Sequence, residues 1–329
     1  METPLRTTDG TPDAHGDVRI GISSCLMGEE VRYDGGHARD GFLAGTLSRF
    51  VTFHAVCPEV EIGMGIPREP IRLAASPEGV RLIEVAGGVD HTRAMKRFAA
   101  RKAEDLARLA LHGYIFKQSS PSCGLFGVKV HRDGSAVRRE GRGLFAAAVV
   151  ERLPLLPVEE EGRLCDPDLR ENFFERVFAY RRLTRLFGRR WTYGGLAGFH
   201  ASETMLLLAH EPMRCRALGR FVAAAKGTSP RRIAREYPRS FMDILSRRAT
   251  VRRHTSVLRR MAGHLKARVG AAERAEILGR IENYRLGLVP LIVPVTLIRH
   301  AARIHGVDSL KGQTYLDPHP MELMLRNHV

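Results

Sequence analysis

The chain has 329 residues, and its 44% hydrophobic and 7% aromatic content is typical of a folded globular protein, which excludes a disordered or low-complexity chain. Its formal net charge of +16 lies entirely in the second half: residues 1–164 carry 22 basic and 22 acidic residues, whereas residues 165–329 carry 30 and 14. A neutral half joined to a strongly basic half indicates a chemical domain tethered to a domain that binds a polyanion.

The leader and the cysteine content bear on location. Residues 1–17 contain no apolar segment of the signal-peptide type, so we expect a disordered leader. Five cysteines, an odd number in a long chain, favour a reducing environment over a disulfide framework. The apolar run at 286–298 is too short to span a bilayer and contains Pro290 and Pro294. We therefore expect a cytoplasmic protein without a membrane segment.

The first half alternates strand-like runs with a helical pattern. Residues 18–25 (VRIGISSC), 50–57 (FVTFHAVC) and 113–123 (GYIFKQSSPSC) are predicted as strands with their following turns, and residues 71–85 as a strand-turn-strand element. Residues 91–112 have apolar positions at helical spacing, with Gly113 just beyond their end. This order predicts an α/β domain over residues 18–157, with a Rossmann-like parallel sheet.

The second half is helical in pattern. A linker is expected at 153–170, where three prolines and an acidic triplet interrupt regular structure. We predict an all-α helical bundle over residues 158–329. Its expected helices cover 171–187, 200–210, 213–227, 239–248, 256–269 and 272–287.

Each strand-like run of the first half ends in a cysteine, Cys25, Cys57 or Cys123, and a glycine- or proline-rich turn follows. The carboxyl ends of parallel strands share one edge of a sheet, where open α/β sheets bind ligands, so the three thiols are expected to meet. Three is one fewer than the four cysteines that close an ordinary zinc or iron–sulfur site. A metal held there would keep an open position for a substrate.

The spacing of these cysteines leaves a second interpretation open. Separations of 32 and 66 residues match no CxxC-type signature, and buried cysteines often serve as small apolar side chains. Cys165, in the expected linker, and Cys215, on an expected helix, lack the turn context and are interpreted as structural.

Three segments carry a family resemblance: SSCLMGEEVRYDGGH, CPEVEIGMGIPREPIRL and FKQSSPSCG. Over about residues 18–157 the chain resembles the TudS-like thiouracil desulfidase family. The second half, with GFHASETMLLLAH and QTYLDPHPMELMLRN, is similar to the YbgA-type helical domain that often follows it. The complete chain thus resembles the fused two-domain enzymes that remove sulfur from 4-thiouridine in tRNA.

The resemblance implies a 4Fe-4S cluster that Cys25, Cys57 and Cys123 hold, with a fourth iron open to the sulfur of the substrate. It also implies that Glu59 and Ser120 are the catalytic pair, which serve the protonation of the ring and the activation of water. The expected reaction is a non-redox desulfuration that gives uridine and hydrosulfide. From the residues alone, Glu59 reads as a surface carboxylate and Ser120 as a turn hydroxyl.

Polar residues beside the cysteines are candidates for contacts with the substrate or the cluster. The alternative for the serines is that they end strands, and for the segment after Cys25 that it forms an Asp-Gly turn with a solvated arginine. The candidates for substrate binding are Ser24, Arg32, Tyr33, Asp34 and Ser122.

Arginine pairs recur along the basic half. On consecutive helices they predict a broad positive surface that contacts phosphates without reading bases, which suits a folded RNA. The candidates for RNA binding are Arg247, Arg248, Arg252, Arg253, Arg259 and Arg260.

One segment departs from the family pattern. The helix that begins Phe-His usually continues with basic residues, whereas Ser202, Glu203 and Thr204 occupy those places here. Arg259 and Arg260 likewise stand where Gln-His is common. We therefore expect an RNA surface that is shifted toward the arginine pairs.

The expected partners are tRNA and a thiolated uracil base or nucleoside, with no obligate protein partner. Two alternatives remain open. One is a desulfidase of free thionucleobases with a regulatory helical domain, and the other is a non-enzymatic RNA-binding protein whose thiols hold structural zinc or iron.

Overall fold

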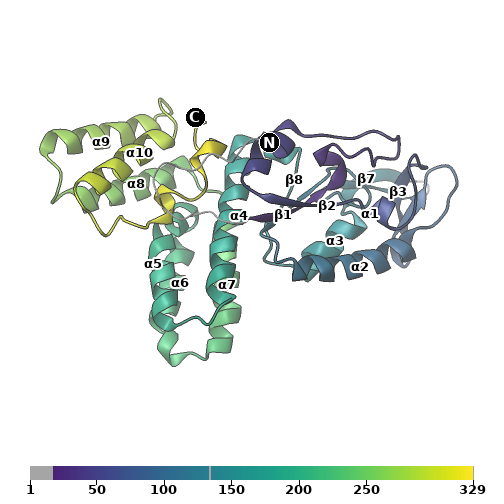
Figure 1. Cartoon of the computed structure of the whole chain (residues 1–329), viewed down its shortest axis with the longest axis horizontal. Helices are drawn as coiled ribbons and strands as arrows, with labels where there is room; N and C mark the ends of the chain where they lie inside the picture. Colours follow the sequence, from purple (N-terminus) through teal and green to yellow (C-terminus); the bar gives the residue numbers. More distant parts are fainter. Residues whose placement is uncertain (1–17, 133–134, 329) are drawn as a thin grey trace, which may run out of the picture. The chain divides into compact units, whose positions relative to one another are not determined.

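The computed structural model describes residues 18–132 and 135–328, and it divides into two compact units on either side of the Asp166–Pro167 bond (Figure 1). The first unit is α/β with a parallel sheet and the second is helical, which confirms the predicted fold class. The leader that we expected to be disordered, residues 1–17, lies outside the described residues.

The first unit is built on a four-stranded sheet in the order β2-β1-β5-β8, and every pair in it is parallel. The strands are β1 (Arg19–Ser23), β2 (Thr52–Val56), β5 (Gly113–Phe116) and β8 (Val158–Glu160). The apolar run of β1 explains its central place, because Ile20 and Ile22 are fully buried. Since the strands run the same way, their carboxyl ends share one edge.

A second sheet has the order β4-β3-β6-β7. Its strands are β3 (Ile71–Ser76), β4 (Gly79–Glu84), β6 (Val128–Arg132) and β7 (Ser135–Gly141). The antiparallel pair β3-β4 confirms the predicted strand-turn-strand element, with Ser76 opposite Gly79 at its turn. The pair β6-β7 was not predicted, because β6 alternates over two buried valines, too short a pattern to recognise.

Two helices, α2 (Thr92–Arg108) and α3 (Leu144–Arg152), pack against each other along one side of the first unit (Figure 1). Buried aromatic rings fill this core: Tyr114 and Phe116 stack with centroids 4.1 Å apart, and Phe145 of α3 meets both edge-on. Short helical turns follow the first two strands of the sheet, namely η1 (Ser24–Met27), η2 (Phe42–Thr46), η3 (Leu47–Arg49) and α1 (Pro58–Glu61).

The acidic triplet of the expected linker is part of the first unit. Strand β8 pairs with β5, and all three glutamates are buried. Glu160 accepts hydrogen bonds from the backbone N–H groups of Leu125 and Phe126, at 2.7 and 3.1 Å. These carboxylates therefore satisfy buried donors instead of marking an irregular linker.

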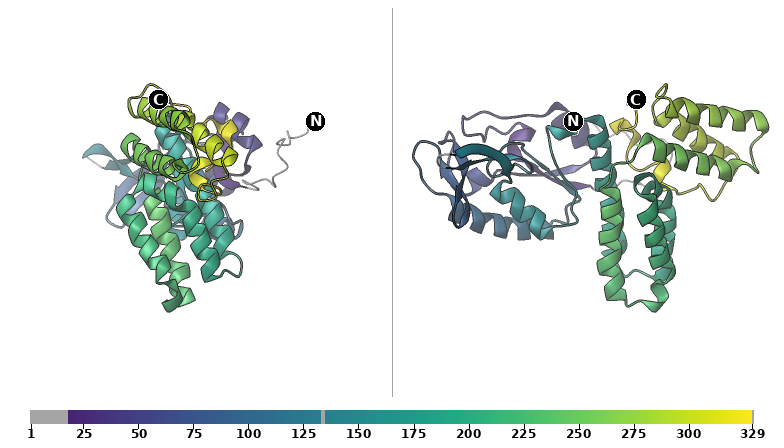
Figure 2. Two further views of the ribbon diagram at one scale, coloured as in Figure 1. Left: turned by 90° about the vertical axis from the view of Figure 1, so that its left-hand side faces the viewer. Right: turned by 180° about the vertical axis from the view of Figure 1, so that it is seen from behind.

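The second unit contains two groups of helices (Figure 2). Four long helices form a bundle: α4 (Pro167–Phe187), α5 (Tyr193–His210), α6 (Pro212–Ala223) and α7 (Pro230–Leu245). The other group is α8 (Val251–Leu265), α9 (Ala271–Arg285) and α10 (Ile292–Ile304), followed by the turns η6 (Thr314–Leu316) and η7 (Met321–Leu323). Tyr237 and Phe241 of α7 are fully buried in the shared core.

Prolines explain where the helix prediction differs. Pro167, expected to interrupt regular structure, is the first residue of α4. Helix α7 begins at Pro230, nine residues before the expected helix, and it continues through Pro238 in its interior. Helix α10 was not predicted, but Pro294 is only its third residue. Proline is tolerated in a first turn, because its missing N–H has no partner there in any case.

The C-terminal segment is anchored by a buried ion-pair network. Arg326 is 3% exposed and donates to Glu171 at 3.2 Å and to Glu175 at 2.5 Å, both on α4. Glu175 also meets His210 at 3.1 Å.

Across the described ranges, we find no helix with the length and hydrophobicity that crossing a bilayer requires.

Candidate active site

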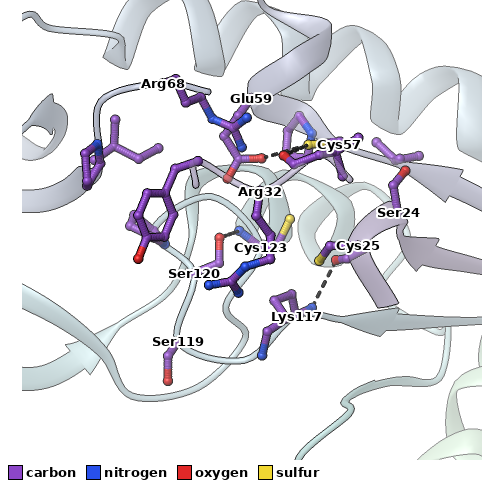
Figure 3. A pocket seen from close by; sticks show the side chains of 18 of the residues that line it. Ser24, Cys25, Arg32, Cys57, Glu59, Arg68, Lys117, Ser119, Ser120 and Cys123 are labelled. Atoms are coloured by element: carbon purple, nitrogen blue, oxygen red, sulfur yellow. Dashed lines mark hydrogen bonds between the residues drawn. The ribbon is translucent and has the colours of Figure 1, made fainter. Parts of the chain in front are cut away.

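Three neighbouring strands of the parallel sheet deliver the three cysteines to one cavity. Cys25 follows β1 within η1, Cys57 follows β2 directly and precedes α1, and Cys123 lies in the turns after β5. All three line a cavity of about 430 Å³, and Figure 3 shows their sulfur atoms at its wall. The shared edge of β2, β1 and β5 therefore brings these thiols together.

The cavity does not favour free thiolates. Burial raises the pKa of the Cys25 thiol to about 11 and that of Cys57 to about 12, and it raises the pKa of Cys123 well above its usual range. The carboxylate of Glu59 adds to the increase in all three. Thiolates in this place need a strongly positive centre as a partner, which is what a bound metal supplies.

The donor set indicates the kind of centre that would fit here. Thiolates are the ligands of iron–sulfur clusters, in which each cysteine binds a different metal atom. The three thiols that line the cavity are suited to hold such a cluster.

A hydrogen-bonded chain connects the two residues expected to be catalytic. The Ser122 hydroxyl donates to Oε1 of Glu59, and its oxygen lies 3.0 Å from Oγ of Ser120. The second carboxylate oxygen, Oε2, accepts from the Cys57 thiol at 3.5 Å. Glu59 and Ser120 line the cavity, whereas Ser122 is fully buried behind them. The chain therefore gives a proton a hydrogen-bonded route between the Glu59 carboxylate and the Ser120 hydroxyl.

The turn that carries Cys123 is packed tightly by two glycines. A Cβ atom on Gly143 would lie 2.3 Å from the backbone oxygen of Ser122 and 2.8 Å from the nitrogen of Cys123. A Cβ atom on Gly124 would lie 2.7 Å from the backbone oxygen of Ser120. Gly143 also donates its N–H to the oxygen of Gly124 at 2.7 Å. The start of α3 therefore fixes the position of the third thiol.

The sequence offers Lys117 either as a phosphate contact or as a solvated charge, and the structure places it in the cavity wall. Lys117 forms an ion pair with Glu161, at the end of β8, and it is 19% exposed. Glu161 also accepts from the backbone N–H of Gln118 at 2.7 Å. The position of Lys117 directly after a strand indicated that it would lie at the edge of the sheet. Its partner Glu161 could not be recognised, because it belongs to the acidic triplet that we expected in a linker. Ser23, which also lines the cavity, accepts from the Lys117 N–H at 3.0 Å.

The structure brings three of the five substrate-binding candidates to the cavity wall, namely Ser24, Arg32 and Tyr33. Asp34 does not line it: its carboxylate accepts from the Arg32 guanidinium at 3.3 Å and from the N–H of Gly36 at 3.1 Å. The guanidinium beside it lowers the pKa of the Asp34 carboxyl. Asp34 thus orients Arg32 and closes a turn.

The six arginines expected to bind RNA differ in their surroundings. Arg252 and Arg260 line a groove, as Arg216 does, and none of the three has a carboxylate partner among the described residues. Arg253 pairs with Glu211 and Arg259 with Glu282. The remaining two, Arg247 and Arg248, are exposed.

The residues that depart from the family pattern have internal partners. Glu203 is fully buried, and its carboxylate accepts from Arg182 at 2.6 Å and from the Thr314 hydroxyl at 2.9 Å. The hydroxyls of Ser202 and Thr204 donate to backbone oxygens of their own helix. This part of α5 contributes to packing and leaves few polar groups for a ligand.

The fold and the site define a two-domain protein: a parallel-sheet domain with a thiol-lined cavity, joined to a basic helical domain. Family models match both halves, that of 2-thiouracil desulfurase over residues 20–161 and that of DUF1722, a protein of unknown function, over residues 205–320. The chain therefore belongs to the TudS-like 2-thiouracil desulfurase family, in the form fused to a YbgA-type domain.

Relatives match each half separately. The uncharacterized protein YbgA of Escherichia coli (strain K12) is 31% identical over 153 residues, which cover 46% of this chain and 90% of YbgA. The uncharacterized protein YbbK of Bacillus subtilis (strain 168) is 32% identical over 108 residues, which cover 31% of this chain and 71% of YbbK. A solved structure of the [4Fe-4S]-dependent thiouracil desulfidase TudS is 28% identical, with a TM-score of 0.36, and covers 45% of this chain and 94% of its own.

Proposed function

We propose that the protein is a 4Fe-4S-dependent desulfidase that converts 4-thiouridine in tRNA to uridine and releases hydrosulfide. One observation carries the proposal: three thiols, a carboxylate and a hydroxyl from different segments line a single cavity in a chain whose other unit is strongly basic. Membership of the 2-thiouracil desulfurase family supports the thiolated uracil as the reacting group.

Cys25, Cys57 and Cys123 would hold the cluster, and their number leaves one metal atom without a protein ligand. When bound, this group supplies a Lewis acid for the thiocarbonyl sulfur, which makes hydrosulfide a better leaving group. In the overall reaction one water adds to the carbon, the carbon–sulfur bond breaks and a carbonyl forms. The oxidation state does not change, so no external electron donor is needed.

Glu59 and Ser120 manage the protons of this reaction. The Glu59 carboxylate takes a proton from the attacking water, and the Ser122 hydroxyl bound to its Oε1 keeps it in position. Ser120, whose oxygen lies 3.0 Å from that of Ser122, lines the cavity and donates a proton to the ring of the base. Because the three groups form one hydrogen-bonded chain, a proton taken from water can return to the ring without leaving the site.

The rim of the cavity suits a nucleotide. Tyr33 is 44% exposed and lies under the Arg32 guanidinium, 5.6 Å from the ring centroid. Arg68, held by its Nη1–H to the oxygen of Gly65 at 3.1 Å, lines the same cavity. We infer that Tyr33 and Arg32 contact the base or ribose and that Arg68 meets phosphate charge, whereas the charge of Lys117 is already paired with Glu161.

The helical unit would bind the rest of the RNA. The groove is lined by Arg216, Arg252 and Arg260, which have no carboxylate partner within the described residues, and by Glu211, whose carboxylate pairs with Arg253. Such a surface contacts phosphates without reading bases, and its affinity falls steeply with salt.

The direct test is incubation of the anaerobically reconstituted protein with total tRNA, followed by nucleoside analysis. Loss of 4-thiouridine, with a matching gain of uridine and free sulfide, is expected. Unchanged 4-thiouridine in the presence of an intact cluster would refute the tRNA substrate.

A second candidate is desulfuration of free thiouracil-like bases, with the helical unit in a regulatory role. The cavity of about 430 Å³ favours it, because that volume suits one small molecule. Steady-state rates for 2-thiouracil, 4-thiouridine and tRNA, compared as kcat/KM, decide between the two. A higher value for the free base than for tRNA would support this second candidate.

A further inference from the structure

A second cationic region lies at one end of the four-helix bundle, apart from the groove of Arg216, Arg252 and Arg260. The loop between α4 and α5 and the loop between α6 and α7 meet there (Figure 2). The Tyr193 hydroxyl donates to the backbone oxygen of Thr228 at 3.5 Å, which joins the two loops. We call this end, residues 187–193 and 225–231, the bundle tip.

The bundle tip contains a hollow with an aromatic wall. A cavity of about 340 Å³ is lined by Phe187, Trp191 and Tyr193 together with Arg189 and Arg190. Phe187 and Tyr193 meet the Trp191 ring at interplanar angles of 62° and 88°, with centroids 5.4 and 5.8 Å away. The half-buried indole packs against the hydrophobic core of the unit and also lines the cavity, so part of its surface is open to a ligand.

The charges around this hollow are free of internal partners. Arg189 and Arg190 are exposed, and so are Lys226 of the neighbouring turn and Arg231 in the first turn of α7. No carboxylate of the described residues pairs with any of these four side chains. By contrast, Arg232 pairs with Glu236 at 3.0 Å, one turn along α7. Arg189 and Arg190 line the hollow, and Lys226 and Arg231 belong to the adjacent loop and helix start, so the bundle tip carries positive charge that attracts an anionic ligand.

An aromatic ring beside unneutralised arginines is how proteins hold single-stranded nucleic acid, because the base stacks on the ring while the cations meet the adjacent phosphates. A fully paired helix offers only its phosphates, because its bases are already stacked on each other. We propose that the bundle tip binds an unpaired nucleotide of the RNA, with the base against Trp191 and the phosphates at Arg189 and Arg190. This inference rests on the proposed function in taking RNA as the partner.

Fluorescence gives a direct readout, because Trp191 is the single tryptophan of the chain. Single-stranded oligouridylate should quench the emission of the full-length protein, whereas a blunt RNA duplex with the same number of phosphates should not. Equal quenching by both, or by neither, would overturn the proposal.

Variants separate the ring from the charges. Trp191→Leu should weaken binding of fluorescein-labelled oligouridylate by about tenfold or more, and Trp191→Phe should restore part of the loss, since stacking needs a ring. Arg190→Ser should lower the slope of log affinity against log salt by about 0.7. Arg239→Ser is the matched control, because Arg239 is an exposed arginine of α7 outside the tip and should leave the slope unchanged. Wild-type affinity in Trp191→Leu would contradict the proposal.

Desulfuration of tRNA, measured beside RNA binding, distinguishes this inference from the proposed function. If the tip variants lose RNA affinity but the wild-type protein does not desulfurate tRNA, the tip stands and the proposed reaction fails. If tRNA is desulfurated and Trp191→Leu binds RNA and turns it over as the wild type does, the proposed reaction stands and the tip inference fails.

Discussion

The two units place their functional groups in opposite ways. In the α/β unit the groups of the site come from segments as far apart as Cys25 and Cys123, and the parallel sheet delivers them to one buried cavity. In the helical unit the charged groups are numerous and spread over many helices, and several are consumed by internal carboxylates such as Glu203 and Glu282. Topology creates the first site, whereas the pattern of ion pairing decides which cations of the second unit remain available.

The largest expected effect tests the convergence of the thiols. Replacing Cys25, Cys57 or Cys123 by Ala should abolish the brown chromophore or the turnover, because each thiol would hold a different metal atom. Cys165→Ala should leave both intact, since Cys165 is an exposed free thiol. Iron and sulfide analysis of the reconstituted proteins provides the measurement, and a cluster that requires Cys165 would break the comparison.

The next effect concerns charge that serves the fold of the helical unit. Arg326→Met should lower the free energy of unfolding by about 3–5 kcal/mol, because it leaves the buried carboxylates of Glu171 and Glu175 without their cation. Arg285→Met, which removes an exposed partner of Glu282, should cost much less, because solvent screens an ion pair at the surface. Denaturant titration followed by circular dichroism measures both, and equal costs would contradict the assignment of a buried network.

Substitutions in the hydrogen-bonded chain of Glu59, Ser122 and Ser120 should lower turnover without loss of the cluster. Glu59→Gln and Ser120→Ala should retain the cluster spectrum and lose about 10²-fold in kcat, the usual size of an acid–base contribution. Ser122→Ala should also lower kcat, because it removes the hydroxyl bound to Glu59. Glu61→Gln is the control, since Glu61 pairs with Lys102 outside the cavity at 2.6 Å. Loss of iron in the Glu59 variant would assign it a structural role instead.

The smallest effect compares neighbouring arginines of α8. Arg260→Ser should lower the logarithmic salt slope of tRNA binding by about 0.7–0.9, because its charge is not neutralised internally. Arg259→Ser should change the slope less, since Arg259 already pairs with Glu282 at 3.1 Å. Filter binding of tRNA at several salt concentrations measures both slopes. Identical slopes for the two variants would mean that internal pairing does not decide which arginines contact RNA.

The sequence was sufficient where one rule connects the position of a residue in the sequence with its location in the fold. Because parallel strands end at one edge, the cysteines after three strand-like runs were expected together, and they line one cavity. The rule failed for Glu161, because recognising its contact with Lys117 required knowing that the short β8 joins the same sheet. Asp34 is a predicted substrate contact, but in the structure its carboxylate accepts hydrogen bonds from Arg32 and from the N–H of Gly36 within the same turn.

In the helical unit the apolar periodicity predicted helices but not which of their arginines form ion pairs with carboxylates. The arginines of α8 look alike in the sequence, and only the packing of neighbouring helices shows that Glu211 and Glu282 take two of them. Trp191 and Tyr193 stand beside an arginine pair in the sequence, but the hollow that they line also includes Pro230, 39 residues from Trp191, so it could not be predicted.

The contact between Gly143 and the turn of Cys123 means that one essential position of the site has no side chain at all. A single methyl group there would have to displace the backbone that carries the third thiol, since it would lie 2.3 Å from the oxygen of Ser122. The residues of the site that do not tolerate substitution therefore include one without any functional group. Glycine is required at the start of α3 because the main chain of Ser122 and Cys123 already occupies the space that a side chain at position 143 would need.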